Sequence, residues 1–192
     1  MTQYTPLDFS SLLGTKGLSD TLLLNHFALY EGDVKNVNLL TELLPSKVIG
    51  SPEHAELRRR FGWEWNGMRL HELYFGNLTQ STATPPTGII LEKILESFGS
   101  LEAWQQEFFG IAAMRGIGWA ILALDPLSGR LFNLWINEHD GGLLAGSVPL
   151  LVLDVFEHAY ITDYGIKRAE YLTLCAEHLD WERATSRLID IR

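Results

Sequence analysis

Cysteine is almost absent from this chain. Only Cys175 carries a thiol among the 192 residues, so no disulfide can form within one molecule. Structural disulfides belong mainly to oxidising compartments, and a chain without one fits a reducing compartment. We therefore expect a cytoplasmic protein, with Cys175 buried on a helix and chemically inert.

Long apolar runs are also missing. No stretch reaches the roughly 20 consecutive apolar residues that a membrane-spanning helix needs. The segment from Met1 to Leu7 lacks the basic region and the apolar core of a signal peptide. Hydrophobic residues nevertheless make up 46% of the chain, which is enough for a substantial core. We expect a globular protein that is not associated with a membrane.

Positive charge is scarce. The chain has 15 lysines and arginines against 24 aspartates and glutamates, and its formal net charge is −9. Nucleic-acid binding depends on cationic contacts to phosphate, so nucleic acid is not an expected partner. A small anionic substrate would need a local positive field against this background.

The first half of the chain carries the spacing of two long helices. Between Leu18 and Leu44 a stripe with steps of three and four residues predicts one helix; it consists of Leu22, His26, Tyr30, Asp33 and Val37. Pro45 ends this helix, and Ser51 followed by Pro52 begins a second one that runs to about Leu78. Two long helices with a short connection predict an antiparallel hairpin, which can bring His26 and His71 face to face.

The second half mixes helices and strands after a polar linker from Thr79 to Gly88. We expect two helices, Ile89 to Phe98 and Leu101 to Met114, and then three strands, Trp119 to Leu124, Leu131 to Asn137 and Val148 to Leu153. A helix from Tyr160 to His178 and a short one from Trp181, capped by Asp180, complete the chain. The predicted fold class is α+β. A helical hairpin domain at residues 1–84 precedes an α/β domain at 88–192, whose three-stranded antiparallel sheet is flanked by helices.

A cluster of charged and metal-binding residues follows the third strand. Asp154, Glu157 and His158 stand within five residues directly after an apolar run. Charges at the end of a buried strand are costly unless something satisfies them. Aspartate oxygen and histidine nitrogen are both good ligands for a transition metal, so this corner is a candidate metal site.

Five motifs, in order along the chain, resemble those of the iron/manganese superoxide dismutases. Residues 154–160, Asp-Val-Phe-Glu-His-Ala-Tyr, are similar to the signature D-x-W-E-H-A-x-Y of that family. The other four blocks are His26 with Asn36-Val37-Asn38-Leu39, the segment from Gly67 to Phe75, Gly116-Ile117-Gly118-Trp119, and Asp163-Tyr164 with Lys167-Arg168-Ala169 and Tyr171. The resemblance covers residues 18–185, which is nearly the whole chain.

The resemblance implies one iron or manganese ion per subunit, bound by three imidazoles and one carboxylate, from His26, His71, Asp154 and His158. It also implies an antioxidant oxidoreductase that converts superoxide to dioxygen and hydrogen peroxide. A metal-binding relative with little or no dismutase activity is the alternative, because the residues at the gateway to the metal are replaced. A further alternative is a non-haem iron oxygenase, which needs only two histidines and a carboxylate.

Residues around the implied metal depart from the usual pattern. Iron-type relatives carry Gln four residues before the second ligand, where this chain has Gly67, and manganese-type relatives supply a Gln from the sheet. The block Asn137-Glu138-His139-Asp140 resembles the latter, so we expect His139 to contact the solvent ligand, in the space that Gly67 leaves. The loop that follows, residues 141–147, looks longer than in relatives.

The gateway positions differ as well. Relatives carry His four residues after the first ligand and Tyr eight after it, where this chain has Tyr30 and Val34. A one-residue deletion would instead place Asp33 at the Tyr position, and we favour Asp33 because it shares the stripe of His26 and Tyr30. As the family Tyr relays protons, Asp33 and Tyr30 are the candidate proton carriers.

The remaining site predictions concern the surroundings of the metal and the subunit contact. Phe156 replaces the signature Trp as an apolar wall, and Trp119 packs near the site. In relatives the signature Glu reaches a ligand histidine of a second subunit, so Glu157 indicates a homodimer. Lys167 and Arg168 would attract the anionic substrate. His54 and His178 match no motif, and we expect both at the surface.

Overall fold

The structure, a computed structural model, describes residues 3–190. Its elements follow in the order α1 (Asp20–Leu43), α2 (Pro52–Phe75), α3 (Gly88–Phe98), α4 (Leu101–Ala112), β1 (Gly118–Leu124), β2 (Leu131–Asn137), β3 (Val148–Asp154), α5 (Ile161–Tyr164), α6 (Arg168–Glu177) and α7 (Trp181–Ile189). Short 3₁₀ turns lie at Ser10–Leu12, Leu44–Ser46 and Glu157–Ala159. The predicted α+β class is confirmed.

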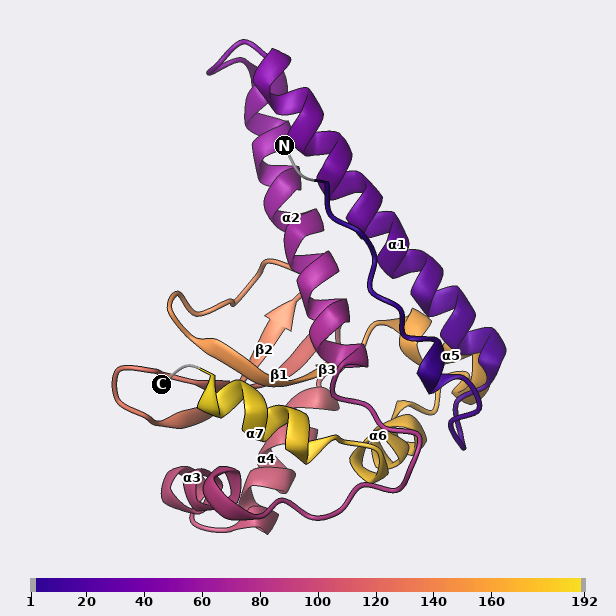
Figure 1. Cartoon of the computed structure of the whole chain (residues 1–192), viewed down its shortest axis with the longest axis vertical. Helices are drawn as coiled ribbons and strands as arrows, with labels where there is room; N and C mark the ends of the chain where they lie inside the picture. Colours follow the sequence, from indigo (N-terminus) through magenta and orange to yellow (C-terminus); the bar gives the residue numbers. More distant parts are fainter. Residues whose placement is uncertain (1–2, 191–192) are drawn as a thin grey trace.

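The two long helices form a hairpin that projects from the rest of the molecule (Figure 1). Ser19 and Ser51 cap them, because each side-chain oxygen accepts a hydrogen bond from the backbone N–H three residues on. Pro52 stands in the first turn of α2, as expected. Every member of the predicted α1 stripe is buried, so this face of α1 packs inward.

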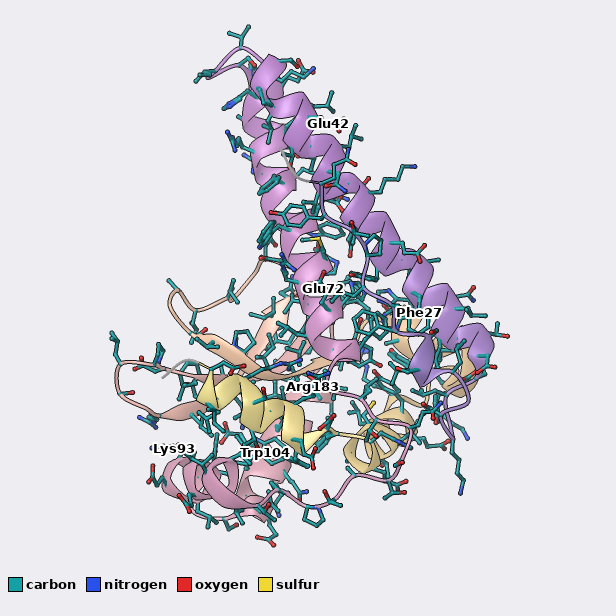
Figure 2. All side chains as sticks on the ribbon, in the orientation of Figure 1. Phe27, Glu42, Glu72, Lys93, Trp104 and Arg183 are labelled. Carbon is teal, nitrogen blue, oxygen red and sulfur yellow. The ribbon has the colours of Figure 1, made fainter. Side chains whose placement is uncertain are left out.

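The sheet has the strand order β2–β1–β3, and both pairings are antiparallel. The central strand β1 is buried along its whole length. The end of α2 packs against β3, whereas α4 packs against β1 and β2 on the side where Trp104 is buried. Figure 1 shows the sheet at the base of the hairpin, and Figure 2 labels Trp104 beside it.

One predicted helix is wrong. The segment from Tyr160 to His178 forms two helices, α5 and α6, separated at Gly165 to Lys167. Gly165 has φ 54, a left-handed conformation that ends α5 and that glycine adopts easily. The second long helix is also three residues shorter than predicted, since α2 ends at Phe75.

Buried apolar residues of the hairpin, the sheet and the C-terminal helices belong to one hydrophobic cluster. Cys175 lies within it, as expected, and burial raises the pKa of its thiol to about 12. The division into two domains stays a prediction. Within residues 3–190, none of the helices combines the length and the apolar character needed to cross a bilayer.

Candidate metal centre

Four predicted ligands converge where the base of the hairpin meets the sheet. His26 comes from α1, His71 from α2, Asp154 from the end of β3, and His158 from the 3₁₀ turn Glu157–Ala159. Their ligand atoms all lie within 4.8 Å of one another. Asp154 Oδ2 is central: it lies 3.1 Å from Nε2 of His26, 3.1 Å from Nε2 of His158 and 3.7 Å from Nε2 of His71.

The turn after β3 is rigid, which fixes two of these ligands. Trp119 of β1 pairs with Asp154, so the carboxylate stands at the last register position of the sheet. Asp154 Oδ1 accepts a hydrogen bond from the backbone N–H of Phe156 at 2.8 Å, and its main-chain oxygen accepts one from the Tyr171 hydroxyl at 2.8 Å. Asp154 Oδ2 is therefore oriented toward the histidines.

The donor set fits a transition-metal ion. Ligand bonds of about 2.0–2.2 Å place neighbouring ligand atoms about 3–4 Å apart, which matches the separations around Asp154. His71 Nε2 is buried and has no hydrogen-bond partner within residues 3–190. An unpaired buried nitrogen is unfavourable unless something binds it, and a cation among these donors would do so. A non-haem iron oxygenase would use only two histidines and one carboxylate, so a fourth donor in the same cluster contradicts that alternative.

The electrostatics favour the metal-binding form at two ligands, His26 and Asp154, whereas at His158 burial is outweighed by the Asp154 carboxylate, which raises the pKa. Burial lowers the pKa of His26 to about 4, so its imidazole is neutral at pH 7. Burial alone would raise the pKa of Asp154, but the contacts with His158 and His26 outweigh it and hold this pKa well below its usual value. Neutral imidazole and ionised carboxylate are the states that coordinate a cation.

Aromatic rings surround the four ligands. Trp119 is fully buried and contacts the ring of His71 edge-on, with 5.0 Å between centroids. Phe156 stacks on His158 at 5.1 Å and on His139 at 4.9 Å. Trp119 and Phe156 thus lie beside the site, as predicted, and three of the four ligands are buried there, whereas His158 keeps 26% of its side chain accessible.

His139 lies in this wall, with 6.1 Å between its ring centroid and that of His71. Trp119 Nε1–H donates to His139 Nδ1 at 3.2 Å. The tryptophan nitrogen can only donate, so Nδ1 accepts and the neutral ring carries its proton on Nε2. Burial lowers the pKa of His139 to about 4, which keeps the ring neutral at pH 7.

The space directly beside Gly67 is occupied by the Asp33 carboxylate. A Cβ placed on Gly67 would meet the Asp33 carboxylate at 2.7 Å, and its three nearest neighbours all belong to Asp33. The interpretation that Gly67 makes room for His139 stays a prediction. Asp33 fills that space, and its Oδ2 lies 3.1 Å from His71 Nδ1. Val34, the other candidate for this position, belongs to the hydrophobic core.

Tyr30 is buried and its hydroxyl is engaged in hydrogen bonds. It donates to Glu72 Oε1 at 3.1 Å and accepts from the backbone N–H of Leu7 at 2.9 Å. Glu72 is labelled on α2 in Figure 2. Burial raises the pKa of Tyr30 to about 12, so the phenol keeps its proton at neutral pH. The proton-carrier roles of Tyr30 and Asp33 stay predictions.

The residues expected at the subunit contact and in substrate attraction lie outside this cluster. Glu157 is exposed, and His158 is the ligand with the most accessible side chain, at 26% exposure. Arg168 donates to the main-chain oxygens of Met114 at 2.6 Å and Gly116 at 2.7 Å. Lys167 forms an exposed ion pair with Glu170 at 2.9 Å.

The two histidines outside the motifs differ in how deeply they are buried. His54 is half-buried near the start of α2. The prediction of a surface position for His178 is wrong, because this residue is 5% exposed and its Nδ1 lies 2.8 Å from the main-chain oxygen of Thr79. His178 ties the end of α6 to the segment after α2, a pairing that local sequence does not reveal.

Two contacts of the site were not predicted. Trp63 packs edge-on against His139 with 4.2 Å between centroids, and its Nε1 donates to Glu138 Oε2 at 3.2 Å. The hydroxyls of Tyr74 and Tyr171 lie 2.9 Å apart, and Tyr171 in turn holds Asp154. Tyr74 stands three residues after His71, so helical spacing alone places it on the same side of α2.

Comparison with known proteins agrees with this geometry. Residues 86–187 match the family described as iron/manganese superoxide dismutases, C-terminal domain. The chain is 37% identical over 177 residues to superoxide dismutase (Fe) of Cupriavidus metallidurans, covering 89% of this chain and 88% of the relative. It is 35% identical over 191 residues to superoxide dismutase (Fe) of Aquifex pyrophilus, covering 95% and 89%.

A manganese relative is similar over a shorter stretch. Superoxide dismutase (Mn) 2 of Haloferax volcanii is 41% identical over 122 residues, which are 64% of this chain and 61% of the relative. The match to the family extends over more than half of the chain, and the two iron relatives align with most of it. The chain belongs to the iron/manganese superoxide dismutase family.

Proposed function

We propose that this protein is a superoxide dismutase, with one iron or manganese ion held by His26, His71, Asp154 and His158. The observation that carries the proposal is the convergence of these four donors within 4.8 Å. When bound, such an ion supplies one-electron redox chemistry: two superoxide anions and two protons give one dioxygen and one hydrogen peroxide.

The ligands and the aromatic wall prepare the site. Asp154 is the single carboxylate among the four proposed ligands, which limits the negative charge that an anionic substrate meets. Trp119 and Phe156 exclude bulk water and strengthen the electrostatic interactions at the site. His139, fixed by Trp119, presents its Nε2–H as a donor. We assign to this donor a hydrogen bond to solvent at the site, as in relatives that carry His there.

The test combines metal analysis with superoxide consumption. Protein expressed in iron- or manganese-supplemented medium should hold close to one ion per chain and should consume superoxide far faster than the free ion. His71→Ala should lose both properties, whereas His54→Ala should keep them, because His54 lies outside the site. Circular dichroism would check that both variants fold. A wild-type chain without metal and unchanged by His71→Ala would refute the proposal.

A second candidate function is a metal-binding relative with little dismutase activity. The observation that favours it is Asp33, whose carboxylate lies 3.1 Å from a proposed ligand and which we align with the neutral Tyr of relatives. A fixed negative charge there would repel superoxide. One bound ion per chain, with superoxide consumption no faster than the free ion, would select this candidate.

Attraction of the substrate is assigned to Arg168, with a smaller part for Lys167. Within residues 3–190, no carboxylate forms an ion pair with Arg168, so its positive charge is not cancelled by a contact. Lys167 is partly neutralised by Glu170. If Arg168 acts at long range, salt should reduce the rate of superoxide consumption in the wild type more than in Arg168→Gln.

We further propose a homodimer in which Glu157 reaches the outer nitrogen of a ligand histidine of a second copy. The support is that Glu157 is exposed and that the adjacent His158 keeps 26% of its side chain accessible. Carboxylates commonly accept the free N–H of a ligating histidine. A cytoplasmic location is proposed from the single buried cysteine.

Glu157→Gln tests the dimer. In analytical ultracentrifugation the variant should have a higher dimer dissociation constant than the wild type, because an amide accepts the histidine N–H more weakly than a carboxylate does. Glu170→Gln is the matched control, as it removes an exposed acid whose ion pair within residues 3–190 is with Lys167. A wild-type monomer at micromolar concentration would contradict the homodimer.

A further inference from the structure

Asp33 is a buried acid without an ordinary partner. The residue is 9% exposed, and its Oδ2 has no hydrogen-bond partner within residues 3–190. The other buried acid of the hairpin, Glu64, is fully paired: Arg60 Nε donates to it at 2.6 Å and Asn36 Nδ2 at 3.1 Å. An unpaired buried carboxylate is unfavourable for folding, so its position calls for an explanation.

A polar group close to this oxygen belongs to a proposed metal ligand. Asp33 Oδ2 lies 3.1 Å from His71 Nδ1, whose N–H is directed to the main-chain oxygen of Gly67 at 2.8 Å. The carboxylate can approach this closely only because residue 67 lacks a side chain, as a Cβ there would stand 2.7 Å from Oδ2. Gly67 thus supports this contact in two ways: it has no Cβ to displace Asp33, and its carbonyl orients the His71 ring.

The contact lies on the edge of the His71 ring that does not face the other ligands. His71 Nε2 faces Asp154 Oδ2 at 3.7 Å, whereas Nδ1 faces Asp33. Asp33 is also absent from the group of converging donors. The contact that Asp33 makes with the proposed ligands is therefore with the outer edge of the His71 imidazole.

We propose that Asp33 is a positioning residue that makes metal retention and the reduction potential depend on a carboxylate beside the His71 Nδ1–H. A cation at Nε2 polarises the ring and increases the positive charge at Nδ1–H. Binding of the ion thereby relieves the unpaired charge of Asp33, and Asp33 in turn favours the bound and the more oxidised ion. The inference rests on the metal centre of the proposed function.

The test is metal release from the full chain loaded with Mn²⁺ during expression. In excess EDTA, Asp33→Asn should release Mn²⁺ about 10–100-fold faster than the wild type, the usual range for losing such a partner. The metal-free variant should unfold at the same temperature as the metal-free wild type or higher, because the unpaired charge is gone. The midpoint reduction potential of the loaded variant should shift upward, since removing a negative charge favours the reduced ion.

Glu64→Gln is the matched control. It removes a buried acid from the same helix pair but leaves His71 Nδ1 untouched. We expect its Mn²⁺ release rate to stay within about twofold of the wild type and its potential to be unchanged, even where its unfolding temperature falls. A similar acceleration in both variants would assign the effect to general loosening of the hairpin and overturn the inference.

The outcomes separate this inference from the proposed function. A wild-type chain that retains Mn²⁺ but consumes no superoxide refutes the dismutase activity, and the release rates still decide the role of Asp33. If the wild type is an active dismutase and Asp33→Asn releases Mn²⁺ at the wild-type rate, only the inference fails. It also fails if Asp33→Asn lowers the unfolding temperature equally with and without metal, as a purely structural residue would.

Discussion

Gly67 occupies a position in α2 where a methyl group has no room. In an exposed helix interior, Gly→Ala usually stabilises by about 0.5–1 kcal/mol, because alanine has the higher helix propensity. At Gly67 the new Cβ would stand 2.7 Å from the Asp33 carboxylate, so one of the two must move. We predict that Gly67→Ala destabilises the metal-free chain by about 1–2 kcal/mol in urea unfolding.

Two controls make this prediction specific. Gly62 lies on the same helix with nothing within 4 Å of its Cβ position, so Gly62→Ala should stabilise the chain. In an Asp33→Ala background, Gly67→Ala should become neutral or stabilising, because the group that it displaces is absent. An additive double-mutant cycle would show that the two residues do not share this space.

The ligands themselves could be identified from the sequence, whereas their surroundings could not. Asp154 and His158 stand out because charged residues end an apolar run, and His26 and His71 carry family motifs. The burial of Asp33 followed from the α1 stripe, but its contact with His71 depends on how α1 and α2 are rotated about each other. Helical spacing gives the face of a residue and not its partner across the interface.

At the scale of elements, one arginine joins α7 to the end of α2 and to strand β3. Arg187 of α7 donates to the main-chain oxygen of Leu73 at 3.0 Å and to that of Leu150 at 2.7 Å. It also donates to the side chain of Asn77 at 3.3 Å, and Asn77 pairs with both main-chain groups of Val152. The end of α2 and the strand that carries Asp154 are therefore tied to α7.

We predict that Arg187→Met destabilises the chain by about 2–4 kcal/mol, because two partly buried carbonyls lose a charged donor. Arg187→Lys should recover only part of this loss, since one ammonium group cannot reproduce the planar fork. Arg183→Met on the same helix is the control (Figure 2), because Arg183 is exposed. The measurement is urea unfolding, and equal effects of the Arg187 and Arg183 changes would contradict this account.

Element boundaries were predictable where a local signal exists. Ser51 and Asp180 begin helices as predicted, and each side chain accepts a capping hydrogen bond. Ser19 caps α1 in the same way, one residue after the predicted start of that helix at Leu18. The division between α5 and α6 was missed because apolar spacing continues through it and a single glycine is compatible with a helix. Only the three-dimensional structure shows that Gly165 adopts φ 54.

At the scale of the whole molecule, the metal centre joins parts of the chain that are distant in sequence. His26 and His71 come from the hairpin, and Asp154 and His158 come from the sheet and the turn after it. A bound ion would therefore hold the base of the hairpin against the rest of the fold. Anything that binds only the folded state stabilises it, by about 4 kcal/mol when free metal exceeds the dissociation constant 1,000-fold.

We predict that removing the metal lowers the unfolding temperature by about 10 °C, from about 2–4 °C per kcal/mol for a chain of this size. Differential scanning calorimetry of the loaded and the chelator-treated chain would measure the change. His71→Ala should unfold at the same temperature with and without metal, because it lacks one of four ligands, whereas His54→Ala should keep the full difference. If chelation left the wild-type unfolding temperature unchanged, the four donors would not be holding an ion that joins the hairpin to the sheet.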